Sequence, residues 1–94
     1  MMAIETKPWD AADYLNTPED IAAYLDAYLE DGTSEEIREA LKTIARSHGM
    51  TLLAKETGLT REALYKALGD KGNPTLDTLV RVTRALGLRL SLAA

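Results

Sequence analysis

The stretch that decides the fold is Thr51-Leu52-Leu53-Ala54-Lys55-Glu56-Thr57-Gly58-Leu59-Thr60-Arg61-Glu62-Ala63-Leu64-Tyr65-Lys66-Ala67-Leu68. It predicts two short helices, from about Thr51 to Thr57 and from Arg61 to Leu68, with Thr51 and Thr60 as their N-caps. A small residue, Ala54, is needed where the second helix crosses the first, and Gly58 can adopt the positive φ of a tight turn. Four residues are expected to point inward: Leu53, Leu59, Leu64 and Ala67. This spacing is typical of a helix-turn-helix.

The outward face of the second helix carries the residues that are suited to DNA. Arginine and lysine donate to guanine edges or phosphates, and Glu62 can accept from cytosine in the major groove. The predicted DNA-binding residues are Thr51, Thr60, Arg61, Glu62, Tyr65, Lys66, Lys71 and Asn73. The competing interpretation is an ordinary helical hairpin with a polar surface. The caps, the inward apolar residues and the outward bases together favour DNA binding.

Three further helices are predicted around this motif. The first begins at Pro18 after the N-cap Thr17, carries an apolar stripe at helical spacing and stops at Asp31-Gly32. Ser34 is expected to cap the next helix, which ends at His48-Gly49 with Gly49 as a left-handed C-cap.

The last predicted helix begins near Thr75 and is ended by Gly87. The tail from Leu88 to Leu92 alternates apolar and polar residues, which is the period of a strand with one buried side. The expected fold is therefore all-α with five helices and a short C-terminal β-strand. That strand needs a partner strand, either from a second copy or from Ala3 to Thr6.

Composition restricts the class of protein. Ninety-four residues favour one domain, and the absence of Phe requires an aliphatic core rich in Leu and Ala. With no Cys and one His, we expect neither a disulfide framework nor a metal site. No apolar run is long enough to cross a membrane, and the start of the chain lacks a signal-peptide pattern, so we expect a soluble cytoplasmic protein. No nucleophile triad, phosphate loop or small-molecule site is recognisable, which argues against an enzyme and against a cofactor.

Charge divides the chain into two parts. Residues 1–36 hold ten acidic residues and one base, for a net charge of −9, whereas residues 37–94 hold ten bases and five acids, for a net charge of +5. Charge runs are often only solvated faces, but opposite signs in two halves point to two different partners. We expect the acidic arm and first helix (1–36) to belong to the same compact unit as the helix-turn-helix part (37–94).

Several segments of the sequence resemble one known family. The helix-turn-helix stretch, followed by Gly72-Asn73-Pro74-Thr75 and Ala85-Leu86-Gly87-Leu88, resembles the probable addiction module antidote proteins, which are similar to HigA-type antitoxins. Lys7-Pro8-Trp9-Asp10 and the segment from Tyr14 to Ile21 also match, so the resemblance covers nearly the whole chain. It implies a lambda-repressor-like helix-turn-helix antitoxin of a type II module, which neutralises a basic RelE/ParE-type toxin and represses the shared operon by binding operator DNA.

The resemblance gives the acidic half a purpose. Acidic side chains on the first helix can steer a basic toxin, because charge complementarity sets the association rate and the choice of partner. Aromatic side chains are candidate anchors, although tyrosines four apart on an apolar stripe more often pack in a core. The predicted toxin-binding residues are Trp9, Asp20, Tyr24, Asp26, Tyr28, Glu30 and Asp31.

The residues also leave other functions open. A plain helix-turn-helix regulator without a toxin partner is the main alternative, and a pure interaction protein is a third. The outward bases argue against the third, and the charge division favours the antitoxin over the regulator. We expect a homodimer in either case, since one short recognition helix reads too few bases and paired helices match palindromic half-sites.

Overall fold

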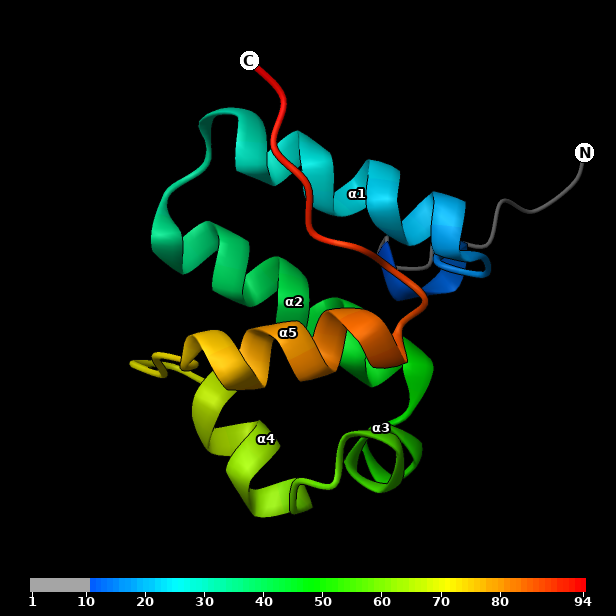
Figure 1. The fold of residues 1–94 in the computed structure, drawn as a ribbon, viewed down its shortest axis with the longest axis vertical. Helices are drawn as coiled ribbons and strands as arrows, with labels where there is room; N and C mark the ends of the chain where they lie inside the picture. Colours follow the sequence, from blue (N-terminus) through cyan, green and yellow to red (C-terminus); the bar gives the residue numbers. More distant parts are fainter. Residues whose placement is uncertain (1–10) are drawn as a thin grey trace, which may run out of the picture.

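The computed structural model describes residues 11–94, in which five α-helices follow a short 3-10 helix (Figure 1). In chain order the elements are η1 (Ala11–Tyr14), α1 (Pro18–Asp31), α2 (Ser34–His48), α3 (Met50–Thr57), α4 (Arg61–Leu68) and α5 (Leu76–Ala85). Helix α1 lies against α2 at one end of the molecule, and α3 and α4 form the other end below α5 (Figure 1). No helix within residues 11–94 has the length and apolarity needed to span a bilayer.

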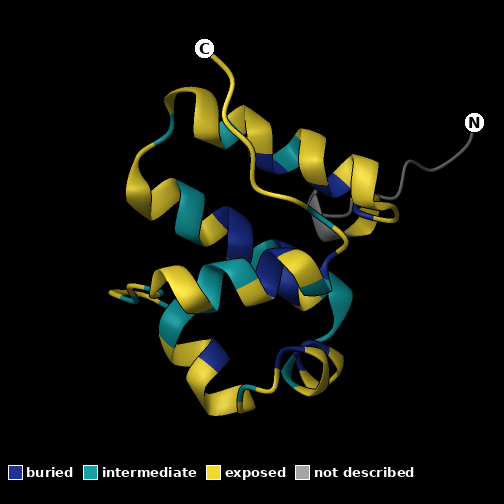
Figure 2. Cartoon of the chain, viewed as in Figure 1, coloured by how far each residue is buried: buried dark blue, intermediate teal, exposed yellow. Residues whose placement is uncertain are grey.

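The core is aliphatic, as the composition predicts. Each helix contributes the side chains of one face, and the buried positions gather where α2, α3, α4 and α5 meet (Figure 2). The largest apolar side chains that are fully buried are Ile44, Leu53, Leu64, Leu68 and Val82. Ile21 and Leu25 bring α1 into the same core. Burial of these faces stabilises helices that are too short to persist alone in water.

Several predicted helix ends are confirmed. The Oγ1 atoms of Thr17, Thr60 and Thr75 each accept a hydrogen bond from the backbone N–H three residues later, at 3.0–3.1 Å. These contacts satisfy one free donor at the start of α1, α4 and α5. Pro18 occupies the first turn of α1, where its missing N–H costs nothing.

The predicted N-cap of α2 was wrong by one residue. Thr33 caps the helix, and Ser34 is its first residue. Glu36 Oε1 accepts from the Thr33 N–H at 2.9 Å, while Thr33 Oγ1 accepts from the Glu36 N–H at 3.2 Å. This reciprocal pair needs a glutamate three residues after the cap. Glu36 occupies that position relative to Thr33, whereas the residue three positions after Ser34 is Ile37. Hydrogen bonding to the Thr33 backbone N–H, followed by hydrogen bonding to the Thr33 side chain, lowers the pKa of the Glu36 carboxyl below its usual range.

The junction between α2 and α3 also differs from the prediction. Helix α3 begins at Met50, so Thr51 lies inside it and is not its cap. Gly49 serves as both the C-cap of α2 and the N-cap of α3, which leaves no separate position for a threonine cap. Its φ of 106° is positive, but its ψ of 115° lies outside the left-handed helical region that was expected.

The predicted C-terminal strand is absent from the described residues. Gly87, with a φ of 79°, ends α5, and the Leu88 N–H donates to the Thr83 carbonyl at 2.9 Å. The chain then runs past α1 as an extended tail (Figure 1). The alternating pattern of Leu88, Leu90 and Leu92 is real, but a strand exists only when a second strand pairs with it, and residues 11–94 of one chain supply none.

Candidate nucleic-acid interface

The turn between α3 and α4 has the geometry that the sequence predicts. Gly58 adopts a left-handed conformation, with φ 76° and ψ 9°, and its N–H donates to the Ala54 carbonyl at 3.0 Å. Thr57 Oγ1 donates a hydrogen bond to the Leu53 carbonyl at 2.7 Å and accepts one from the Leu59 N–H at 3.3 Å. Leu53 and Leu64 are fully buried. The angle between the two helices is therefore fixed by backbone geometry and by the core.

Arg81 adds a contact to this turn that sequence reasoning missed. Its Nη1 donates to the carbonyl of Thr57, the last residue of α3, at 3.1 Å, and its Nε lies 3.0 Å from Asp77 Oδ2 on the preceding turn of α5. The carbonyls at a helix C-terminus lack intrahelical partners, so a cation there satisfies one of them. Arg81 thus ties α5 to the end of α3, beside the start of the turn.

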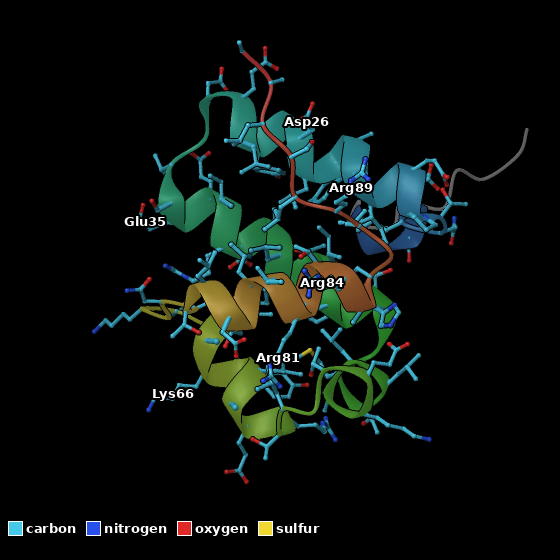
Figure 3. All side chains as sticks on the ribbon, in the orientation of Figure 1. Asp26, Glu35, Lys66, Arg81, Arg84 and Arg89 are labelled. Carbon is cyan, nitrogen blue, oxygen red and sulfur yellow. The ribbon has the colours of Figure 1, made fainter. Side chains whose placement is uncertain are left out.

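The predicted outward residues of α4 are exposed. Arg61, Glu62, Tyr65 and Lys66 all lie on the solvent face, and Lys66 extends away from the body of the molecule (Figure 3). The Arg61 guanidinium stands 5.7 Å from the centre of the Tyr65 ring, and its Nη2 donates to the Tyr65 hydroxyl at 3.4 Å. This pairing orients a guanidinium along α4, which prepares it for the planar contacts that arginine makes with guanine or phosphate.

The loop from Gly69 to Thr75 turns back tightly on the end of α4. The Gly72 N–H donates to the Gly69 carbonyl at 2.9 Å, and a Cβ at Gly72 would meet the Ala67 carbonyl oxygen, so only glycine fits there. Lys71 has a positive φ of 63°, a conformation uncommon for a residue with a side chain. Arg38 Nη1 on α2 donates to the Gly72 carbonyl at 3.2 Å. The loop thereby holds Lys71 and Asn73, both exposed, next to α4.

The remaining members of the predicted DNA-binding set are Thr51 and Thr60. Both are exposed, at the first turn of α3 and the N-cap of α4. Thr60 Oγ1 accepts from the Ala63 N–H, so this side chain also supports the helix start. The structure thus brings the predicted residues to α3, α4 and the following loop. Sequence patterns could not reveal Arg38 and Arg81, because each reaches a carbonyl at least 24 residues away.

A second contact holds the last turn of α3, this time to α2. His48 Nε2 at the end of α2 lies 2.6 Å from Glu56 Oε1 in the last turn of α3. The histidine stands at the α2 C-terminus, where a cation complements the negative end of the helix dipole. The pair holds α3 against α2 and does not point to a catalytic role.

The predicted toxin-binding acids form a separate surface on α1. Asp20, Asp26, Glu30 and Asp31 are all exposed, and α1 carries no basic residue. Asp20 also helps to build the helix start, because its Oδ2 accepts from the Asn16 N–H at 3.4 Å. This acidic surface lies at the end of the molecule opposite α3 and α4 (Figure 1).

The two predicted tyrosine anchors are partly used by the fold. Tyr24 and Tyr28 pack against the core in an edge-to-face pair with ring centres 5.2 Å apart. Burial, followed by the hydrogen bond to Tyr28, raises the pKa of Tyr24 to about 12. Each ring is half-buried and offers only part of its surface to a partner. Trp9, the third predicted anchor, lies outside the described residues.

The described residues therefore define an all-helical, lambda-repressor-like helix-turn-helix protein, with an exposed polar face on α4 and an acidic helix at the far end. A family described as "probable addiction module antidote protein" matches residues 5–94, so the chain belongs to that family.

A protein of Haemophilus influenzae with the description "Uncharacterized protein" is similar to this chain. It is 41% identical over 88 residues, which make up 94% of this chain and 91% of the relative. No solved structure matches the chain. Membership of the antidote family implies an antitoxin role and a toxin partner in general.

Proposed function

We propose that this protein is the antitoxin of a type II toxin-antitoxin module, which binds operator DNA through α3 and α4 and neutralises a basic toxin of the RelE/ParE type. It acts in the cytoplasm by binding and not by catalysis, and it represses its own operon. Family membership supports the toxin partner. The observation that carries the DNA-binding part is the exposed set Arg61, Glu62, Tyr65 and Lys66 on a helix whose turn is fixed by Gly58.

The division of charge supports two partners on one chain. Acids crowd α1 at one end, while the bases Arg61 and Lys66 belong to α4 at the other end, where Lys66 projects outward (Figure 3), and Lys71 belongs to the loop that follows α4. Exposed charges act over roughly 10 Å at moderate salt, so each end presents its own sign to a partner. A basic toxin at α1 leaves α4 free for DNA. The protein works as a homodimer whose two recognition helices enter half-sites one helical turn apart.

DNA binding is tested by gel shift with the DNA upstream of the protein's own gene. We expect the double variant Arg61→Ala, Lys66→Ala to lose most of its affinity. Loss of a bidentate base contact costs about 1–3 kcal/mol and relaxes sequence preference, whereas loss of a phosphate contact lowers the salt dependence by about one charge. Arg89→Ala on the tail removes the same charge as Arg61→Ala and should bind normally. Unchanged affinity in the double variant would contradict the assignment.

Toxin recruitment is tested by association kinetics with the protein encoded beside this gene. Neutralising the α1 acids should slow association, most of all at low salt, because steering by exposed charge is screened by ions. The variant replaces four residues with the matching amides: Asp20, Asp26, Glu30 and Asp31. As a single-site comparison, Asp26→Asn on α1 should slow association and Asp70→Asn beside α4 should not. DNA binding should survive in all of them, and equal rates for Asp26→Asn and Asp70→Asn would contradict steering by α1.

A further inference from the structure

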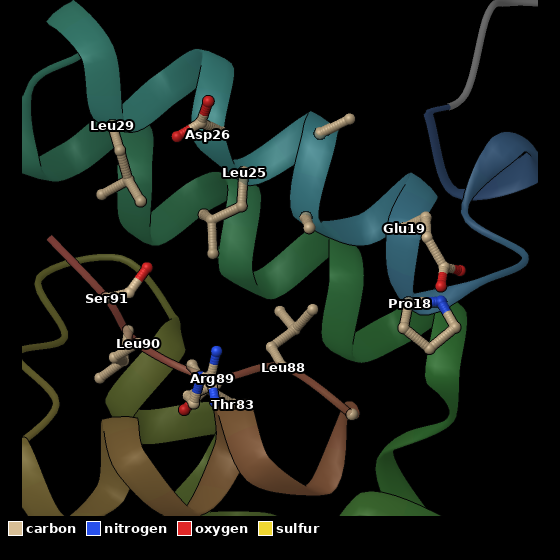
Figure 4. A pocket seen from close by; sticks show the side chains of 13 residues that line it. Pro18, Glu19, Leu25, Asp26, Leu29, Thr83, Leu88, Arg89, Leu90 and Ser91 are labelled. Carbon is tan, nitrogen blue, oxygen red and sulfur yellow. The ribbon is translucent and has the colours of Figure 1, made fainter. Parts of the chain in front are cut away.

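A channel runs between α1 and the C-terminal tail, on a surface that carries none of the predicted toxin anchors except Asp26. Its volume is about 530 Å³. Its apolar lining consists of Ala22, Leu25 and Leu29 on the α1 wall and of Leu88 and Leu90 on the tail wall (Figure 4). Leu29 and Leu90 also border an adjoining cavity of about 210 Å³ that continues toward α2 and α5. The two residues therefore stand where both hollows meet.

Two of the apolar side chains that line this channel are open to solvent. Leu29 and Leu90 are 52% and 48% exposed, and Leu92, the next apolar residue of the tail, is completely exposed. Contiguous exposed apolar surface in a folded protein marks an interaction site more often than chance. Here the exposed leucines line opposite walls of one channel, with Leu29 on α1 and Leu90 on the tail, so they form a continuous apolar surface.

The tail wall also has unpaired main chain. Within residues 11–94, the last backbone hydrogen bond of the tail is the one that Leu88 donates to Thr83. Residues 89–94 run on without helix or strand, with apolar and polar side chains in alternation. Such a segment is a template for strand addition, in which main-chain hydrogen bonds give affinity and alternate side chains fill pockets.

Charge decides between two possible occupants of the channel, a second copy of this chain and a basic segment of a different protein. Helix α1 carries Glu19, Asp20, Asp26, Glu30 and Asp31 and no base, and Glu19 and Asp26 line the channel itself. A second copy docked symmetrically would bring two such helices together, and like charges across an interface are unfavourable. A segment with lysine or arginine beside its apolar residues finds opposite charge on the α1 wall. Arg89, the one base that lines the channel, belongs to the other wall.

We propose that the channel between α1 and the tail receives an extended, apolar segment of the toxin flanked by basic residues, which pairs with the tail as an added strand. This proposal rests on the antitoxin function proposed above and assigns the place and chemistry of its protein contact. Leu29 and Leu90 are the apolar contacts, Glu19 and Asp26 meet the flanking bases, and the backbone of residues 89–92 supplies the pairing.

The test measures binding of the protein encoded beside this gene to the full-length chain by titration calorimetry. We expect Leu29→Asp and Leu90→Asp each to weaken binding tenfold or more, as for a central apolar contact of an interface. The matched control is Leu52→Asp, because Leu52 is 47% exposed and belongs to α3, at the end of the molecule opposite α1. Circular dichroism and melting verify that each variant is folded.

Proline variants test the main-chain pairing separately. Successive N–H groups of an extended chain point to opposite edges, so one of Ser91→Pro and Leu92→Pro removes a donor that faces the partner. We expect at least one of the two to weaken binding, with Ser91→Ala and Leu92→Ala as side-chain controls. If neither proline variant differs from its alanine control, the strand pairing is wrong.

The outcomes separate this proposal from the antitoxin function. If the unaltered chain binds the neighbouring protein and both aspartate variants bind it as tightly, the channel is not the contact and the antitoxin function stands. The aspartate variants can also bind the neighbouring protein as tightly as the unaltered chain does but sediment as monomers where the unaltered chain sediments as a dimer. In that case a second copy occupies the channel, and the proposal is overturned. If the unaltered chain does not bind the neighbouring protein, the antitoxin function itself fails.

Discussion

Gly58 offers a direct test of how the recognition helix is held. Its φ of 76° lies in the left-handed region, where a side chain costs about 1–2 kcal/mol. A Cβ built there would lie 3.6 Å from Arg81 Nη1, which is ordinary van der Waals contact. The cost of Gly58→Ala is therefore conformational strain, not crowding.

The net effect of Gly58→Ala is smaller than this strain. Alanine also restricts the unfolded chain, which returns about 0.4–1 kcal/mol to stability. We expect a net loss of about 1 kcal/mol, and for a chain of this size that lowers the melting temperature by about 4–8 °C. Gly58→Asn should lose less, because asparagine tolerates the left-handed region. Gly58→Val should lose more, because it is β-branched.

Thermal denaturation followed by circular dichroism measures these differences. The order expected is parent, Gly58→Asn, Gly58→Ala, Gly58→Val, from the most to the least stable. If Gly58→Ala and Gly58→Val melted at the temperature of the parent, the turn between α3 and α4 would not require a left-handed residue. The placement of the helix-turn-helix would then be refuted.

Two further predictions concern stability. Thr33→Ala should lower the free energy of unfolding by about 1 kcal/mol, because it removes a helix cap, while Ser34→Ala should change it little. Urea denaturation measures both variants, and a larger loss of stability for Ser34→Ala than for Thr33→Ala would show that Ser34 is the cap. Stability should fall between pH 10 and pH 12, because the pKa of Tyr24 rises from its ordinary value of 10.0 to about 12 in the folded chain, so the unfolded chain ionises first. Melting curves of Tyr24→Phe should show a smaller alkaline loss, and an identical loss would contradict the burial argument.

Local patterns predicted the helices because their signals lie within a few consecutive residues. Thr60 caps α4 and Leu64 points inward for reasons that are contained in eight consecutive residues. The choice between Thr33 and Ser34 was also local, since only Thr33 has a glutamate three residues later. The capping box of Thr33 and Glu36 therefore distinguishes the two candidates from the sequence alone.

Other features depend on how the helices pack and could not be predicted from spacing. Arg81 reaches Thr57, and Arg38 reaches Gly72, only because α5 and α2 stand beside the helix-turn-helix. The tail shows that a clear local pattern can still fail to predict the structure. Its alternation predicted a strand that the described residues do not form, because pairing requires a partner that the described part of one chain does not provide. The channel beside Leu90 became visible only once α1 and the tail were placed together.

The antitoxin function is tested most directly by growth of cells that express the neighbouring protein from an inducible promoter. We predict that the neighbouring protein alone stops growth and that co-expression of the full-length chain restores it. The double variant Arg61→Ala, Lys66→Ala should restore growth equally well when both genes are driven by foreign promoters, because neutralisation uses α1 and not α4. Growth that stays arrested in the presence of the full-length chain, with both proteins detected in the cells, would contradict the antitoxin function.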